Sequence, residues 1–448
     1  MREAIIRYVL VLLLAVTIGS FPPQPQEIHA PNPSGHYEKV SGVHLLCLQG
    51  SPYEMGLQQG TLLREQLREL VRLHLYEHAL LEYGSLHPWL LAHARPLDRT
   101  LPTALRSEMR GIADGAGLSY QDVLLLNILP DLLALSCTSS SGESSRSPFS
   151  SDAAVRPAIR CPQNGEAVCC SSFAVWDSAT VDGGLLVGHN QDSAEADLFD
   201  RYLMVVARRP SEGNAFVSAG PMGMVGVWAG MNEEQVAVLL SSSPSVDVAS
   251  SGQPPQFLLR QVLEHAGDLT QAKRVLLAAD RLYGGNVLLG DGKAPGAVAI
   301  EMSAHRHAVF EADVGSEPLV RTNHFLDPAL AMAQRHALSD PARSASLARL
   351  GALQTLLELN KGWIGADKAL ALLMDDRDGQ VSGRFGTESL VNESDTSQSV
   401  LFYPATLALW VTRRDVEPPS VAGSARAADS SYLQLTLTSL LSQCLVGG

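Results

Sequence analysis

The chain has 448 residues, of which 46% are hydrophobic, 18% charged and 6% aromatic. A chain of this length can bury a large core, and the hydrophobic fraction excludes a disordered protein. Its 33 basic and 47 acidic residues give a net charge of −14, which argues against a surface for nucleic acid or anionic membranes. Six cysteines are too few for a disulfide scaffold. These figures favour a globular enzyme.

Residues 1–30 have the pattern of a secretory signal peptide. Arg2 and Arg7 precede the apolar stretch Tyr8–Ile18, and proline-rich sequence follows it. About a dozen apolar residues fall short of the roughly 20 that span a bilayer. We therefore expect an exported protein, periplasmic or secreted. An uncleaved N-terminal membrane anchor is the alternative.

Three helical segments are predicted before residue 136. Within Pro52–Leu91 apolar residues recur at helix-face spacing, and Gly56 and Gly60, four apart, suit close packing of a helix start. A second helix is expected near Leu101–Gly115. A third begins after Ser119, whose hydroxyl can cap its first turn.

The composition changes at Ser136–Arg156, a Ser-rich segment that we expect to be a surface loop. Blocks of strands, helices, strands, helices and a closing hairpin follow, which predicts an α+β fold rather than alternating βαβ units. The expected strands are Cys169–Trp176, Leu185–His189, Tyr202–Arg208, Ala215–Ser218, Val225–Ala229, Gln235–Leu240, Asn286–Leu289, Gly296–Met302, Ala308–Ala312, Ser399–Tyr403 and Leu407–Thr412. The expected helices are Gln256–His265, Leu269–Ala279, Pro328–Leu338, Ser344–Leu359 and Gly365–Leu373.

The adjacent pair Cys169–Cys170 is the unusual chemical feature. The sequence has no G-x-S-x-G elbow, Walker loop, H-E-x-x-H or C-x-x-C motif, and His305 and His307 lack the further ligand pattern of a metal site. A Cys at the start of a strand becomes a chain terminus if the preceding bond breaks. Its α-amine, with a pKa near 7.7–8.0, could then take the thiol proton. A buried or oxidised cysteine pair is the alternative.

From Cys170 onward, short motifs follow one another in an order typical of a known family. They resemble the nucleophile strand, the G-[RQ]-N-x-D strand, the G-x-N-E turn and the T-N-H element of acyl-coenzyme A:6-aminopenicillanate acyltransferases, which are cysteine N-terminal-nucleophile (Ntn) hydrolases. These motifs are Cys170–Phe173, Gly188–Asp192, Val227–Glu233 and Thr322–His324. The family's helical prosegment is similar to three upstream segments, Gly56–Gly60, Arg110–Gly115 and Leu126–Asn127. Its closing hairpin is similar to Ser399–Val411.

The resemblance implies a four-layer αββα sandwich of the Ntn-hydrolase type. Residues 31–169 would be a helical prosegment ending in the Ser-rich loop, and residues 170–448 the catalytic chain of the same folded domain. It also implies self-cleavage between Cys169 and Cys170, after which Cys170 is acylated by an amide or thioester. Water then gives hydrolysis, whereas an amine gives transfer. The implied partner is a small acyl substrate, with no cofactor and no metal.

The same resemblance implies roles for four further residues. Asn323 matches the amide that donates to the developing oxyanion, and Asp192 matches the acid that orients the new α-amine or the substrate. His189 stands where relatives often carry an Arg that contacts substrate, so a substrate-binding role there could depend on pH. Arg349 is the residue retained from a Ser-x-x-Arg-x-x-Arg pattern, and we assign it to substrate binding.

Two other functions fit the sequence. One is a phospholipase B-like ester or lipid hydrolase on the same fold, and the other is a catalytically inactive exported binding protein. The cysteines add a separate expectation: if Cys170 stays a thiol, five remain, so at least one more cannot pair within the chain. Cys137 and Cys161 bracket the Ser-rich segment and form the disulfide we would test first.

Overall fold

The computed structural model describes residues 35–78, 86–138, 170–192, 200–311, 318–334, 341–375, 396–413 and 431–444. These residues belong to one unit, Ser34–Gly448. The predicted signal peptide, Cys169 and the sequence from 139 to 169 lie outside the described residues. No helix among the described residues has the length and apolarity needed to cross a membrane.

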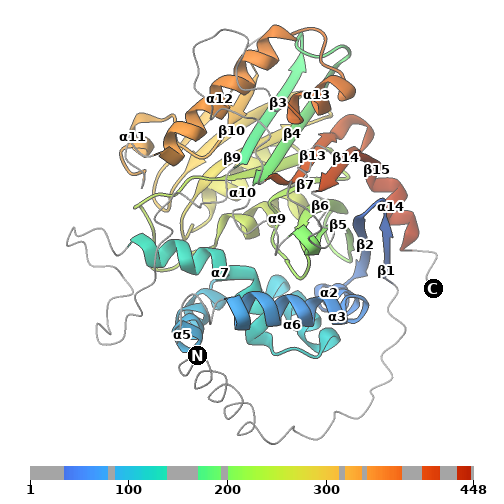
Figure 1. The fold of residues 1–448 in the computed structure, drawn as a ribbon, viewed down its shortest axis with the longest axis vertical. Coiled ribbons are helices and arrows are strands. Elements are labelled where there is room, and N and C mark those ends of the chain that lie inside the picture. The colour runs from blue at the N-terminus through green and yellow to red at the C-terminus, as the bar shows by residue number, and fades with distance from the viewer. Residues whose placement is uncertain are drawn as a thin grey trace, which may run out of the picture. The chain divides into compact units, whose positions relative to one another are not determined.

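Two β-sheets lie at the centre of the fold (Figure 1). Within the described residues, the larger sheet has nine strands in the order β1-β2-β5-β6-β7-β8-β9-β10-β11, and only β2 and β5 pair in parallel. Its strands are β1 His36–Val40, β2 Val43–Gly50, β5 Leu203–Pro210, β6 Phe216–Pro221, β7 Ala229–Asn232, β8 Val236–Ser242, β9 Gly285–Asp291, β10 Gly296–Met302 and β11 His307–Glu311.

The smaller sheet has six strands in the order β12-β3-β4-β13-β14-β15 within the same described residues, and its pairs are antiparallel. Its strands are β12 Leu319–Arg321, β3 Cys170–Asp177, β4 Gly183–Asp192, β13 Thr396–Tyr403, β14 Ala408–Arg413 and β15 Leu433–Thr436. The closing hairpin predicted from the sequence is therefore confirmed as β13 and β14.

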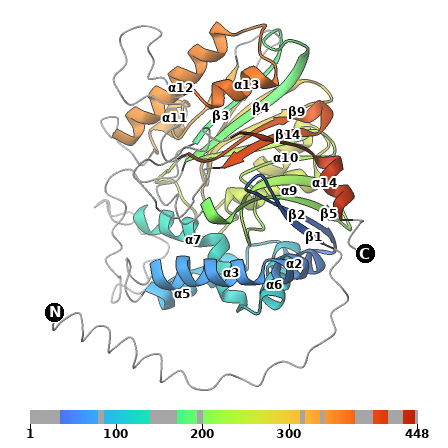
Figure 2. The same cartoon turned by 45° about the vertical axis from the view of Figure 1, so that its right-hand side comes forward.

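The two sheets pack face to face, and helices cover their outer faces (Figure 2). Successive side chains of a strand point to opposite faces. In β5, Val205 joins the core between the sheets, whereas Met204 packs against the N-terminal helices. In β3, Ala174 faces the other sheet and Phe173 faces the outer helices. The expected four-layer αββα sandwich is confirmed.

The outer helices divide between the two sheets. On the nine-stranded sheet lie α9 Pro255–His265 and α10 Leu269–Ala278. On the six-stranded sheet lie α12 Pro341–Leu359 and α13 Ala366–Leu373, with the short α11 Pro328–Ala331 preceding them. The last helix, α14 Leu437–Gln443, packs its apolar side chains into the core between the sheets.

The N-terminal helices also cover the nine-stranded sheet, on the side of β2 and β5. They are α2 Pro52–Leu62, α3 Arg64–Leu70, a π-helix at Val71–His78, α5 Leu86–Asp98, α6 Thr103–Ala116 and α7 Tyr120–Thr138. The hydroxyl of Ser119 accepts from the backbone N–H of Asp122 at 3.1 Å, so the predicted cap of the third helix is confirmed.

Glycines allow α2 and α6 to touch along their backbones. A Cβ on Gly56 would lie 2.0 Å from the Glu108 carbonyl oxygen, and a Cβ on Gly115 would lie 2.5 Å from that of Leu57. No side chain fits at such distances. The close packing expected from the Gly56–Gly60 spacing is confirmed, and it brings Glu108 of α6 against the sheet.

Several predicted elements need correction. Val225–Ala229 is not a strand, because its backbone donors bond elsewhere: Val225 N–H donates to the Asn127 amide and Val227 N–H to the Gln256 carbonyl. The strand begins only at Ala229. The single helix expected over Pro52–Leu91 is broken near Leu63, and the π-helix follows α3.

Three further differences concern segment ends and missed strands. The helix expected over Pro328–Leu338 ends at Ala331, and α7 continues to Thr138, past the expected start of the Ser-rich loop. Strands β1, β2, β12 and β15 and helix α14 were not expected. Most of these segments are short, and β2 and β12 pair with strands far away in the chain, β5 and β3.

Candidate active site

Strand β3, called the nucleophile strand here after its predicted role, begins at Cys170, which is 3% exposed and is present as a thiol. Alternation along β3 puts the side chains of Cys170 and Ser172 on the same face as Ala174, toward the nine-stranded sheet. The first strand residue of the predicted catalytic chain therefore faces the interior of the sandwich.

Strand register brings Asn323 beside Cys170. In the antiparallel pair β12–β3, Leu319 lies opposite Ala174 and Arg321 opposite Ser172. Two residues farther along the chain, Asn323 reaches the level of Cys170. The Cys170 backbone N–H donates to Asn323 Oδ1 at 2.7 Å. Two sequence-predicted site residues that are 153 positions apart are thus in direct contact.

Groups from three segments hold Asn323: α12, the segment after α11, and the end of β8. Its backbone N–H donates to Ser346 Oγ at 2.8 Å, and its carbonyl accepts from Gln334 Nε2 at 3.0 Å. In its side chain, Nδ2 donates to the Ser242 carbonyl at 2.8 Å and Oδ1 accepts from Arg349 at 3.0 Å. The amide is therefore fixed in one orientation, which is what a preorganised hydrogen-bond donor or acceptor requires.

Arg349 of α12 connects the nucleophile strand with Asn323. Its Nη1 donates to the Cys170 carbonyl at 2.5 Å and to Ser171 Oγ at 3.0 Å, while Nη2 donates to Asn323 Oδ1. The side chain is fully buried. A guanidinium presents several donors in a rigid plane, so one residue can hold both neighbours at once. Ser346 lies one helical turn earlier on the same helix face.

His189 lies diagonally across from Cys170, two residue pairs farther along the β3–β4 ladder. It pairs with Ser172, and its Nδ1 is 2.8 Å from Ser172 Oγ, which is 2.9 Å from Ser241 Oγ. Burial lowers the pKa of His189 from 6.5 to about 4, so the imidazole is neutral near pH 7. Within the described residues, its buried Nε2 has no hydrogen-bond partner.

Asp192 lies at the end of β4, next to the position paired with Cys170. It is fully buried, and its Oδ1 accepts from Thr396 Oγ1 of β13 at 2.5 Å. Alternation puts its side chain on the face of Asn190, whose amide donates to the Leu373 carbonyl of α13. The structure thus brings Cys170, Asn323 and Arg349 into contact, places His189 diagonally from Cys170, and anchors Asp192 on β13.

Sequence reasoning missed several polar neighbours. Ser346 was not predicted as a site residue, although the spacing Arg343-x-x-Ser346-x-x-Arg349 puts it on the helix face of Arg349. No sequence signal pointed to Gln334, which reaches Asn323 from the segment after α11. His324 bonds to Ser346 Oγ at 2.7 Å, and burial lowers its pKa to about 4.

No group of three or more potential metal ligands gathers anywhere in the described part of the chain. His305, one of the two histidines considered for a metal site, bonds instead to Asp247 at 2.6 Å.

Comparison with known proteins gives a family. Residues 179–415 match the model of the acyl-coenzyme A:6-aminopenicillanic acid acyl-transferase family. The chain belongs to this family. The resemblance drawn from the motifs is confirmed, and family membership agrees with the Ntn type of the αββα sandwich. The match begins after Cys170, so it covers His189, Asp192, Asn323 and Arg349 but not the proposed nucleophile.

Among curated proteins, an uncharacterized protein of Archaeoglobus fulgidus is 28% identical over 414 residues, which are 85% of this chain and 65% of that protein. Protein dcd1B of Dictyostelium discoideum is 22% identical over 293 residues, 60% of this chain and 52% of its own length. Protein dcd1A of the same organism is also 22% identical, over 60% of this chain and 60% of its own length. The chain thus spans about half to two thirds of these relatives.

Three similar solved structures are hydrolases or acylases by name. The Caenorhabditis elegans ortholog of N-acylethanolamine-hydrolyzing acid amidase is 18% identical, with a TM-score of 0.37 over 53% of this chain and 93% of its own. A mutant of conjugated bile acid hydrolase from Clostridium perfringens is 14% identical, with a TM-score of 0.41 over 61% of this chain and 94% of its own. Penicillin V acylase from Agrobacterium tumefaciens is 14% identical, with a TM-score of 0.36 over 55% of this chain and 83% of its own.

Proposed function

We propose that the protein is an exported, self-processing cysteine Ntn amidohydrolase or acyltransferase that uses Cys170 as its nucleophile. One observation carries the proposal: Asn323 and Arg349 converge on the backbone N–H and carbonyl of Cys170, whose thiol side chain faces the interior of the sandwich. Family membership supports chemistry at an acyl group. Each group has a defined task in the reaction below.

The first step is self-cleavage. The Cys170 thiol attacks the carbonyl carbon of Cys169, the amide bond between them breaks, and the Cys170 nitrogen takes a proton. Water then hydrolyses the resulting thioester, which releases the Cys169 carboxyl and regenerates the thiol. The new α-amine forms at a nitrogen that is already 2.7 Å from Asn323 Oδ1.

Turnover uses the same groups on an external amide. The α-amine takes the thiol proton, the sulfur attacks the substrate carbonyl, and negative charge develops on its oxygen. The Asn323 amide, whose Nδ2 is oriented by its hydrogen bond to the Ser242 carbonyl, is the group proposed to donate to this oxygen. Arg349 fixes the Cys170 carbonyl and adds positive charge nearby. The leaving amine takes a proton, and water or an acceptor amine resolves the thioester.

The environment of His189 changes the role proposed for it. A neutral imidazole buried at this depth offers a substrate a hydrogen bond and no positive charge. We therefore propose that His189 contacts substrate through Nε2, and that the site does not depend on His189 to neutralise a substrate carboxylate. Asp192, held on Thr396, remains proposed as the acid that orients the new amine or the substrate.

The test compares purified wild-type protein with Cys170→Ala by intact mass under reducing, denaturing conditions. We expect two wild-type polypeptides, the larger beginning at Cys170, and a single chain for the variant. Activity is measured on N-acylethanolamine, a conjugated bile acid, penicillin V and matched esters, each with and without an amine acceptor. Cys170→Ala should abolish turnover.

Thr355→Ala, on the exposed face of α12, is the matched control and should behave as wild type in both measurements. An uncut wild-type chain would show that self-cleavage does not occur. Amide turnover that survives in Cys170→Ala would show that another residue is the nucleophile.

A further inference from the structure

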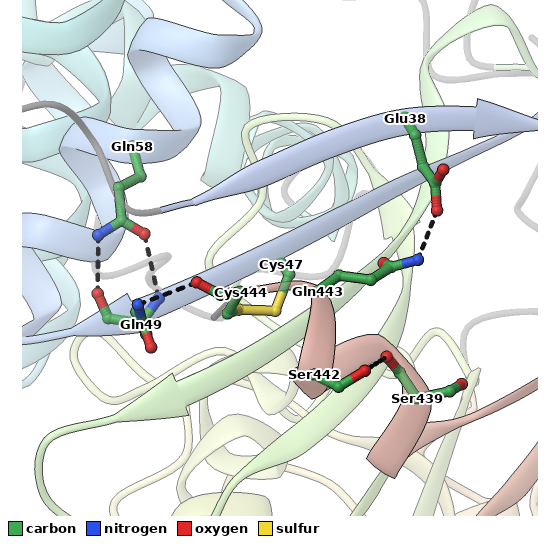
Figure 3. Close-up of a disulfide and its surroundings, with 8 residues drawn as sticks. All are labelled: Glu38, Cys47, Gln49, Gln58, Ser439, Ser442, Gln443 and Cys444. Carbon is green, nitrogen blue, oxygen red and sulfur yellow. Dashed lines mark hydrogen bonds between the residues drawn. A yellow bond between two sulfur atoms is a disulfide. The ribbon is translucent and has the colours of Figure 1, made fainter. Parts of the chain in front are cut away.

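A disulfide joins two parts of the chain that the proposed cleavage would separate. Cys47 of β2 pairs with Cys444 after α14, across a sequence separation of 397 residues (Figure 3). This pairing was not expected from the sequence. The Cys137–Cys161 pair was expected, but Cys161 and the Cys137 side chain lie outside the described residues. Cys47 comes before the bond between residues 169 and 170, and Cys444 comes after it.

We propose that the mature protein is a disulfide-linked pair of polypeptides, in which Cys47–Cys444 tethers the N-terminal fragment covalently to the catalytic chain. The proposal rests on the proposed self-cleavage. It assigns the N-terminal fragment a permanent structural place, because a hydrolysed peptide bond leaves the disulfide as the covalent link between the two products.

The small number of cysteines in the catalytic chain limits which residue can form such a link. After the proposed break, the catalytic chain contains only Cys170 and Cys444. Cys170 is present as a thiol in the structure and is the proposed nucleophile. A covalent link that leaves the nucleophile available must therefore use Cys444, and the structure shows its partner.

Hydrogen bonds around the disulfide connect the same two fragments. Gln49 Nε2 donates to the Cys444 carbonyl at 3.2 Å, and Gln443 Nε2 donates to Glu38 Oε1 at 2.6 Å (Figure 3). Gln58 of α2 in turn holds the Gln49 backbone through two hydrogen bonds. The disulfide thus lies within an organised interface between β1, β2, α2 and α14.

The disulfide is buried, since Cys47 and Cys444 are each 1% exposed. A reductant therefore has little access to the sulfurs while the protein is folded, and reduction should require unfolding. Disulfides form and persist in oxidising compartments. A tether of this kind agrees with the proposed export of the protein.

A tether also changes how the cleaved protein refolds. Two separate fragments must find each other, so their refolding yield depends on protein concentration. Fragments joined by a disulfide meet at an effective concentration set by the linkage, whatever the dilution. After denaturation without reductant, the cleaved protein should therefore refold with the same yield at all dilutions.

The experiment is intact-mass analysis of wild-type protein, denatured and alkylated, with and without reductant. Without reductant we expect one species that is one water heavier than the uncut chain. With reductant we expect two species. Cys444→Ser should give two species in both conditions, whereas Ser442→Ala, on the last turn of α14, should match wild type.

The outcomes separate the tether from self-cleavage. Two wild-type species without reductant, or a linked species in Cys444→Ser, would overturn the tether. An uncut wild-type chain would overturn self-cleavage. In that case the tether is tested on a variant that carries the recognition sequence of a specific protease before Cys169. If the two fragments of the protease-cut protein stay together as one species until reductant is added, the tether is supported. Fragments that separate without reductant overturn it.

Discussion

Two buried arginine clusters in this molecule do different work. In the first, Arg208 of β5 and Arg260 of α9 surround Glu108 of α6, at 3.1 and 2.8 Å, and Glu264 adds a second carboxylate. In the second, Arg349 donates to the carbonyl of Cys170 and to neighbouring oxygens. Opposite charges meet in the first cluster, whereas a cation meets neutral oxygens of the nucleophile strand in the second.

The difference separates a cluster that stabilises the fold from the proposed catalytic cluster. Glu108 belongs to the N-terminal helices, and both of its arginine partners belong to the proposed catalytic chain, so the first cluster joins the fragments. The ring of Phe216 packs below both guanidinium groups, at 5.8 and 4.6 Å. Substitutions there should change stability. Substitutions around Cys170 and Asn323 should change turnover more than stability.

The largest effect is expected for Glu108→Gln. The substitution keeps the shape but leaves two buried guanidinium groups without their shared carboxylate, and breaking a buried pair costs about 3–5 kcal/mol. The free energy of unfolding in urea should fall by that amount, while kcat per folded molecule stays unchanged. Glu65→Gln, in an exposed pair with Arg68, is the control and should cost less than about 1 kcal/mol. A loss of kcat in folded Glu108→Gln would remove the distinction between the clusters.

Asn323→Ala is expected to have the next largest effect, on turnover. Loss of one preorganised oxyanion donor lowers kcat by about 10²–10³-fold. Measured on fully processed enzyme, kcat should fall by this factor, with a smaller change in the free energy of unfolding. Asn360→Ala removes a comparable amide near the end of α12, bonded to the Leu356 carbonyl, and should leave kcat unchanged. Equal effects of the two variants on kcat would argue against an oxyanion role.

The sequence predicted much of this site because its motifs are local. Cys170, Asn323 and Arg349 each lie in a short recognisable pattern, and the family's fold implies that these patterns meet. What the patterns could not supply is the register of β12 on β3, which sets the contact between Asn323 and Cys170. Gln334 holds Asn323 without any motif of its own, because its role depends on the path of the chain after α11.

The fold was predictable to a similar degree. Periodicity and turn signals identified most helices and the hairpins β3–β4 and β13–β14, whereas β2 and β12, which pair with distant strands, were missed. Strand β2 pairs in parallel with β5, about 160 residues away, and its disulfide partner is Cys444. Val225–Ala229 shows the opposite error: the segment is apolar enough for a strand, but the side chain of Asn127 and the start of α9 occupy its backbone donors.

The environment of His189 predicts a stability that falls in acid. The pKa is about 4 in the folded protein and about 6.5 when unfolded, so below pH 6.5 the unfolded chain binds a proton that the folded protein does not. Stability should therefore decrease as the pH falls from 6.5 to 4, by roughly 2 kcal/mol at pH 5 for this site. His189→Asn should show a shallower loss than wild type in urea titrations between pH 7 and 5. An identical slope would mean that the imidazole is not buried in neutral form.

The smallest effect expected is that of Ser346→Ala, and it tests how far the second cluster extends. The Ser346 hydroxyl accepts the Asn323 N–H and also bonds to His324 and Thr322, so it reaches the nucleophile strand through Asn323. Without it, the half-buried Asn323 N–H loses its acceptor and Asn323 loses one of the groups that hold it. We expect kcat to fall about tenfold, or about 1.4 kcal/mol, with KM unchanged. Ser346→Thr keeps the hydroxyl and should restore most of kcat. A Ser346→Ala variant that lowers only the melting temperature, with kcat equal to those of wild type and Ser346→Thr, would contradict this role. Asn323 would then be held sufficiently by Arg349, Gln334 and Ser242, and the residues that govern turnover would end at those three.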